Sequence, residues 1–176
     1  MVFRVAFPAL LLIMAAATAC RTVEEGALET RGQHLLIEFR GCTGPVLNDC
    51  AALQTLMERA VEAAQATIVN SVFHRFAPQG ITGVVVVEES HFSVHTWPEH
   101  GYVAVDVFTC GACHPELARE VLREGLAATN TEWMLIERGL GLPDGDIRIA
   151  AHAVYANARV DADIGQASVP PRTAIS

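Results

Sequence analysis

The chain has 176 residues, of which 51% are hydrophobic and 18% charged, and its formal net charge is −8. This composition excludes a chain that is disordered throughout, because it supplies enough apolar surface for one domain with a core. The negative charge argues against nucleic acid as a partner, since a nucleic-acid surface needs clustered Lys and Arg.

The N-terminal residues 1–30 differ in pattern from the rest of the chain. Arg4 precedes an apolar run over residues 6–17, which is followed by small residues before Cys20. That order is typical of a secretory signal, and the small residues before Cys20 also resemble a lipoprotein signal. The alternative is a start codon assigned upstream of a cytoplasmic enzyme, so the compartment stays open.

One domain is expected over residues 31–156, followed by a poorly ordered tail over residues 157–176, where no hydrophobic period is visible. Period-two and helical hydrophobic patterns define the elements of this domain. In chain order they are a strand over 34–39, a helix over 46–66, strands over 67–76, 82–87, 91–97 and 102–110, a helix over 115–128 and a strand over 133–137. This order predicts an α+β fold, a mostly antiparallel sheet with helices on one face.

Two adjoining segments carry a resemblance to a known family. Residues 89–99, with the sequence ESHFSVHTWPE, resemble the processing and active-site segment of the prokaryotic S-adenosylmethionine decarboxylases. Residues 101–111, GYVAVDVFTCG, continue the match to the second active-site strand of that family. The resemblance runs from Gly32 to Gly111, and more loosely to Gly139.

The resemblance implies a proenzyme that cuts itself between Glu89 and Ser90. The Ser90 hydroxyl would attack the carbonyl of Glu89, and elimination would leave a pyruvoyl group at position 90. Decarboxylation of an α-amino acid leaves a carbanion, and this group, joined to the substrate amine as a Schiff base, would be the electron sink. The products are a β chain ending at Glu89 and an α chain beginning at residue 90.

The family's catalytic roles are carried over to residues that match its motifs. By resemblance, Cys110 is the general acid that returns a proton to the substrate α-carbon. His95 is the base that removes the Ser90 α-proton during self-processing. Thr82, where the family often has Ser, is expected to hydrogen-bond at the processing site. In a regular strand Ser90 and His95 point to opposite faces, so they meet only if the chain bends or bulges near Ser90, or if His95 acts from a strand end.

Substrate-binding roles follow from the same resemblance. Phe76 is expected to stack on the adenine or the sulfonium of S-adenosylmethionine, and Glu99 to accept hydrogen bonds from the ribose. The decarboxylated product would donate its aminopropyl group for spermidine. The pyruvoyl group is the expected cofactor, and no metal site is expected.

One sheet face is expected to lack cover from the helices. Tyr102, Asp106 and Phe108 alternate with a row of valines and fall on that face. By resemblance it packs on a second protomer. The assembly would be a four-layer α/β/β/α homodimer of αβ units, with sites near the interface.

Other interpretations of the same residues remain open at this point. A pyruvoyl decarboxylase of this fold could act on arginine or ornithine instead. Cys110, Cys113 and His114 fit the C-x-x-C-H pattern of c-type haem, with Met134 as an opposite ligand, in an exported protein. Cys110 and Cys113 could also form a redox pair. In an oxidising compartment Cys42, Cys50, Cys110 and Cys113 could form two disulfide bridges, with three possible connectivities. A non-catalytic exported homologue is the remaining alternative.

Overall fold

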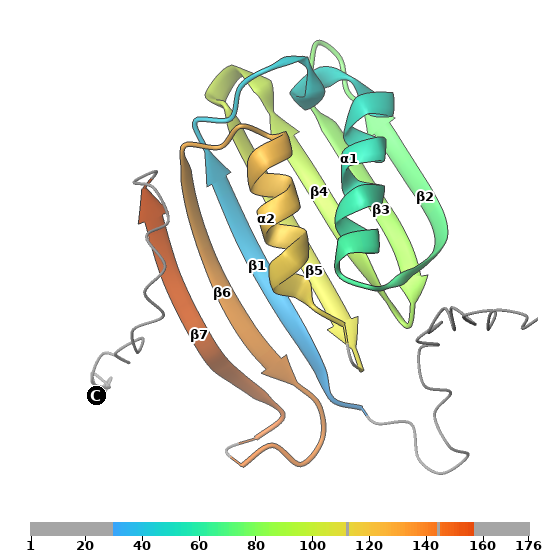
Figure 1. The fold of residues 1–176 in the computed structure, drawn as a ribbon, viewed down its shortest axis with the longest axis vertical. Helices are drawn as coiled ribbons and strands as arrows, with labels where there is room; N and C mark the ends of the chain where they lie inside the picture. The colour runs from blue at the N-terminus through green and yellow to red at the C-terminus, as the bar shows by residue number, and fades with distance from the viewer. Residues whose placement is uncertain (1–29, 112, 144, 157–176) are drawn as a thin grey trace, which may run out of the picture.

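A seven-stranded antiparallel sheet forms the frame of the residues that the computed structural model describes, 30–111, 113–143 and 145–156 (Figure 1). Its strands are β1 (Gly32–Arg40), β2 (Thr67–Arg75), β3 (Ile81–Glu88), β4 (Ser90–Trp97), β5 (Tyr102–Cys110), β6 (Asn130–Arg138) and β7 (Ile147–Ala156). The strand order is β2-β3-β4-β5-β1-β6-β7, so the first strand of the chain lies between β5 and β6. The expected signal-like segment and the expected tail fall outside the described residues.

Two α-helices cover one face of this sheet, α1 (Cys50–Ala63) and α2 (Pro115–Gly125), accompanied by short 3-10 helices η1 (Pro45–Asn48) and η2 (Pro98–His100). Asp49 begins α1, because its carboxylate accepts hydrogen bonds from the backbone N–H groups of Ala51 and Ala52 at 3.0 and 3.1 Å. The helix is therefore shorter than the predicted 46–66, whose first residues form η1 instead.

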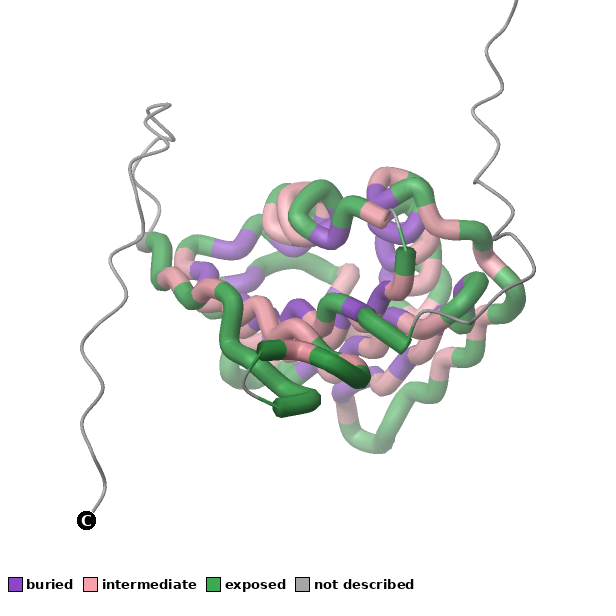
Figure 2. The backbone as a smooth tube through the Cα atoms, turned by 90° about the horizontal axis from the view of Figure 1, so that it is seen from below, coloured by how far each residue is buried: buried purple, intermediate pink, exposed green. Residues whose placement is uncertain are grey.

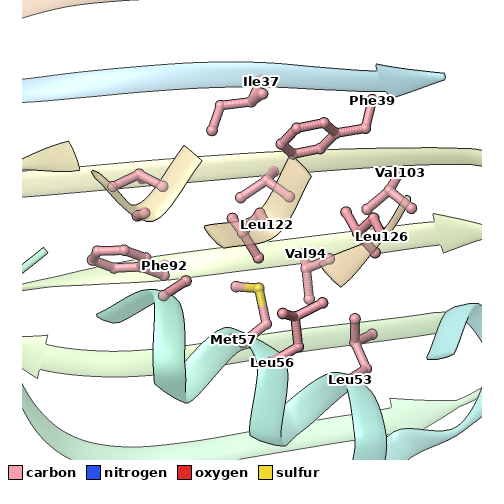
Figure 3. Close-up of a cluster of buried hydrophobic side chains, with 14 of the residues drawn as sticks. Ile37, Phe39, Leu53, Leu56, Met57, Phe92, Val94, Val103, Leu122 and Leu126 are labelled. Atoms are coloured by element: carbon pink, nitrogen blue, oxygen red, sulfur yellow. The ribbon is translucent and has the colours of Figure 1, made fainter. Parts of the chain in front are cut away.

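The core lies between the helices and the sheet face that they cover. The side chains that meet there include Leu53, Leu56 and Met57 of α1, Leu122 of α2, Leu126 just after it, and Ile37, Phe39, Phe92, Val94 and Val103 of the sheet (Figure 3). The predicted alternation of β5 is confirmed, since Val103, Val105 and Val107 are all buried in this layer.

No helix of the described residues covers the opposite face of the sheet, and both helices lie on one side in the view along the sheet (Figure 2). We call it the open face. Its side chains on the central strands include Leu36, Ser93, His95, Tyr102, Asp106, Phe108 and Met134. The predicted fold class, a mostly antiparallel sheet with helices on one face, is confirmed.

The outermost strand β7 was absent from the sequence prediction, which ended at the strand over 133–137. It pairs with β6 along the whole of that strand, with one register shift at Leu135/Ile136. Four of its apolar side chains, Ile147, Ile149, Val154 and Tyr155, are exposed. Among the residues described, neither helix has the length and apolar character needed to cross a membrane.

Candidate active site

Ser90 follows the tight turn that joins β3 to β4. Glu89 is the turn residue, and Val87 on β3 pairs with Ser90 on β4. Val87 is buried in the core, and paired residues point to the same face, so Ser90 points to the helix side of the sheet. Its Oγ is buried and has no hydrogen-bond partner among the described residues. Such a hydroxyl is uncommon in a folded protein, and at this position it adjoins the Glu89 carbonyl.

Cys110 lies at the same end of the sheet as Ser90. β4 and β5 are antiparallel, and His91 pairs with Phe108, so the last residue of β5 lies level with the turn. On its other side Cys110 pairs with Gly32 of β1. A Cβ atom added at Gly32 would lie 3.1 Å from the Cys110 Sγ and 2.8 Å from the Phe108 ring. Glycine is therefore needed there to leave room for the thiol and the ring.

The surroundings of Cys110 favour the protonated form of its thiol. Burial raises the pKa of Cys110, the negative charge of Glu89 raises it further, and the positive charge of Arg138 lowers it. The thiol is therefore neutral at physiological pH and is able to donate a proton. Cys110 is a free thiol in the structure, as are Cys42 and Cys50.

The other four predicted site residues lie together at the opposite end of β4. Thr82 on β3 pairs with His95 on β4, and the Thr82 Oγ1 and His95 Nδ1 atoms are hydrogen-bonded at 3.0 Å. Both line a pocket of about 260 Å³ that Phe76 and Glu99 also line. The remaining residues of this pocket are Gln79, Gly80, Ile81, Thr96 and Trp97.

A single chain therefore holds two separate groups. We call Glu89, Ser90 and Cys110 the cleavage end, and Phe76, Thr82, His95 and Glu99 the pocket end. Within the cleavage end Cys110 shares the open face with Phe108, whereas the Ser90 side chain points to the helix side. Five residues of extended strand separate Ser90 from His95, which is about 16 Å. The register between β3 and β4 shows no shift from Thr82/His95 to Val87/Ser90, so the bulge considered from the sequence does not occur. Ser90 and His95 stay on opposite faces.

A polar network on the open face was not predicted from the sequence. Ser93 Oγ donates a hydrogen bond to Asp106 Oδ2 at 3.0 Å, and His34 Nε2 lies 3.5 Å from Asp106 Oδ1. Arg138 donates to His34 Nδ1 at 3.3 Å. The close approach of His34 Nε2 is the main cause that lowers the pKa of Asp106, which stays ionised. The network reaches across four strands, from β4 to β6.

The haem interpretation does not fit this arrangement. His114 immediately precedes α2, and its backbone N–H donates to the carbonyl of Ala64 at the end of α1, on the helix side. Met134 pairs with Leu36 and lines a small pocket with it on the open face. The two side chains lie on opposite sides of the sheet, so they cannot be the two axial ligands of one haem within a chain.

Comparisons with known proteins give matches to one family of enzymes. The model of the S-adenosylmethionine decarboxylase family matches residues 33–139. The S-adenosylmethionine decarboxylase proenzyme of Thermotoga maritima is 42% identical over 129 residues, which cover 70% of this chain and 99% of that protein. The proenzyme of Prochlorococcus marinus is 51% identical over 100 residues, covering 56% of this chain and 80% of that protein.

A solved structure also matches. The adenosylmethionine decarboxylase from Aquifex aeolicus superimposes with a TM-score of 0.59 at 34% identity, covering 68% of this chain and 99% of that one. Fold and sequence together define an enzyme of the decarboxylase class. Because the family model matches more than half of the chain, the chain belongs to the S-adenosylmethionine decarboxylase family.

Proposed function

We propose that the chain is a proenzyme that cuts itself at Glu89–Ser90 and then decarboxylates S-adenosylmethionine with a pyruvoyl group made from Ser90. The observation that carries the proposal is the buried Ser90 hydroxyl, which has no hydrogen-bond partner among the described residues and adjoins the Glu89 carbonyl in a hairpin turn. The free thiol of Cys110 at the same end of the sheet supports it.

The cleavage follows from the chemistry of these residues. Ser90 Oγ attacks the Glu89 carbonyl carbon, the amide C–N bond breaks and an ester forms. Removal of the Ser90 α-proton by a base then breaks the Cβ–Oγ bond, releasing Glu89 as a free carboxylate. The dehydroalanine left at position 90 takes up water and loses ammonia, which yields a pyruvoyl group. That group would supply the carbonyl that accepts electrons as carbon dioxide leaves the substrate.

The base must come from outside the chain that is cut. His95 is the residue proposed for proton removal, yet it lies about 16 Å along the strand from the Ser90 of its own chain. A two-fold dimer that packs two open faces together would bring the pocket end of one protomer level with the cleavage end of the other. The Ser90 hydroxyl points to the helix side, but Ser90 is the first residue of β4, so a histidine of the partner would reach its α-proton around the end of the sheet. We therefore propose a four-layer α/β/β/α homodimer of αβ units, with each site shared between protomers.

The pocket end suits a nucleoside substrate. Phe76 and Trp97 provide aromatic surface for the adenine and the sulfonium, and Glu99 provides acceptors for ribose hydroxyls. Gln79 already donates a hydrogen bond to Glu99 at 3.0 Å, which orients the carboxylate. These features favour S-adenosylmethionine over arginine or ornithine. The decarboxylated product carries the aminopropyl group used to form spermidine.

Intact-mass analysis tests the proposal directly. Purified protein is expected to contain two chains that part between residues 89 and 90, the second blocked by a pyruvoyl group at its N-terminus. The same preparation is expected to release labelled carbon dioxide from carboxyl-labelled S-adenosylmethionine, and none from labelled arginine or ornithine. A single uncut chain in folded protein would contradict the proposal.

Replacement of Cys110 separates the two reactions. Cys110→Ala is expected to leave the chain cut, because the thiol takes no part in cleavage, and to lower kcat by about 10²- to 10⁴-fold, the usual contribution of a general acid. In the unaltered enzyme kcat is expected to fall only at alkaline pH, because the acid works while protonated and its pKa is raised above the ordinary 9.0. Cys50→Ala serves as the matched control and should behave like the unaltered protein. An active Cys110→Ala enzyme would exclude the assigned role.

A further inference from the structure

Arg138 reaches across the sheet toward the cleavage end. Cys110, Gly32 and Arg138 are paired in one row across β5, β1 and β6. Two strand spacings separate β6 from β5, about 10 Å. The guanidinium of Arg138 nevertheless lies 4.6 Å from the centre of the Phe108 ring on β5. The side chain therefore reaches past β1 and lies over the residue two positions before Cys110.

The polar network holds this guanidinium by one edge only. Arg138 donates to His34 Nδ1 at 3.3 Å, so the proton of the neutral imidazole is on Nε2, which faces Asp106. An arginine has five N–H donors in a planar fork, and this bond uses one of them. No Asp or Glu among the described residues forms an ion pair with Arg138. The positive charge thus lies over an aromatic ring, and among the described residues no carboxylate is in direct contact with it.

We propose that Arg138 binds the α-carboxylate of the substrate, an inference that rests on the proposed function. Cys110 returns a proton to the substrate α-carbon, so that carbon must lie beside the thiol. The carboxylate is bonded to the same carbon and therefore lies within reach of a guanidinium over Phe108. The fork of an arginine matches the two oxygens of a carboxylate.

This assignment gives Arg138 a role in telling substrate from product. The two molecules share the adenosine, the sulfonium and the amine, and they differ only in the carboxylate. When carbon dioxide leaves, the guanidinium loses its partner while every other contact remains. Arg138 therefore strengthens binding of the substrate selectively and leaves the product free to dissociate.

Arg138→Gln and Arg138→Lys, purified as cut enzymes, test this inference. For Arg138→Gln we expect the KM for S-adenosylmethionine to rise about 10- to 100-fold, the loss of a charge-assisted hydrogen bond to a carboxylate. The inhibition constant of decarboxylated S-adenosylmethionine is expected to change less than about twofold, because that ligand has no carboxylate. Arg138→Lys keeps the charge without the fork, and should recover part of the loss.

Arg148→Gln is the matched control, because Arg148 is on the neighbouring strand β7 and pairs with Glu137. It should leave both constants unchanged. The inference is overturned if substrate and product binding weaken together in Arg138→Gln, or if neither changes. It is also overturned if both Arg138 variants stay uncut. Cleavage takes place without substrate, so a residue that only binds the substrate carboxylate should not affect it. An unaltered chain that stays uncut or releases no carbon dioxide refutes the proposed function itself, and the inference with it.

Discussion

Ser90→Ala is expected to remain one uncut chain and to lose decarboxylation completely. Without the hydroxyl no ester forms at Glu89, the peptide bond has no route to elimination, and no pyruvoyl group is made. The methyl side chain fits where the Oγ is buried without a hydrogen-bond partner among the described residues, so the fold should be retained. Intact mass reports the cut, and release of labelled carbon dioxide reports the activity.

Ser93→Ala is the matched control for this variant. Ser93 is on the same strand, three residues away, and its hydroxyl donates to Asp106 instead of facing the turn. It should be cut like the unaltered protein. If Ser90→Ala were cut after residue 89, the chemistry proposed for the hairpin would be wrong.

Mixed dimers of two inactive variants are expected to regain cleavage. Alone, Ser90→Ala lacks the nucleophile and His95→Ala lacks the base, so both should stay almost entirely uncut. In a mixed dimer the intact Ser90 of the His95→Ala chain meets the intact His95 of its partner. Because the two chains differ in what they lack, only the His95→Ala chain is expected to be cut.

Differently tagged variants, produced together and purified through both tags, allow each chain to be weighed separately. Thr82→Val tests the same pocket end, since it removes the hydroxyl bonded to His95 while leaving the ring in place. Mixed dimers that contain no cut chain would refute the shared site. So would efficient cutting of His95→Ala on its own, because His95 would then be unnecessary.

Local patterns were sufficient to predict most of the fold. The alternation over 102–110 identified both the strand β5 and its buried face, because inward valines and outward polar residues follow the two-residue period of a strand. The strand β7 was not predicted from the sequence. Its residues, IRIAAHAVYA, show no clear alternation and are rich in alanine, which is depleted in strands. It is a strand because it pairs with β6, a contact that local sequence patterns do not encode.

The candidate residues of the site were predicted from the sequence one by one, and their arrangement was not. The match to the family pointed to Ser90, His95 and Cys110, and the five-residue spacing correctly indicated that Ser90 and His95 face opposite ways. Nothing local in the sequence shows that β1 lies between β5 and β6. The row of Cys110, Gly32 and Arg138 therefore became visible only with the sheet order.

The place of β1 in the sheet also determines what happens after the cut. The proposed cleavage at Glu89–Ser90 would leave β1, β2 and β3 in one piece and β4 to β7 in the other, with β1 still paired between β5 and β6. The pieces are interleaved along three hydrogen-bonded ladders, β3 with β4, β5 with β1, and β1 with β6. A fold first made by one chain would then be a complex of two chains. Once the two chains have dissociated, their reassembly depends on concentration, because no peptide bond joins them.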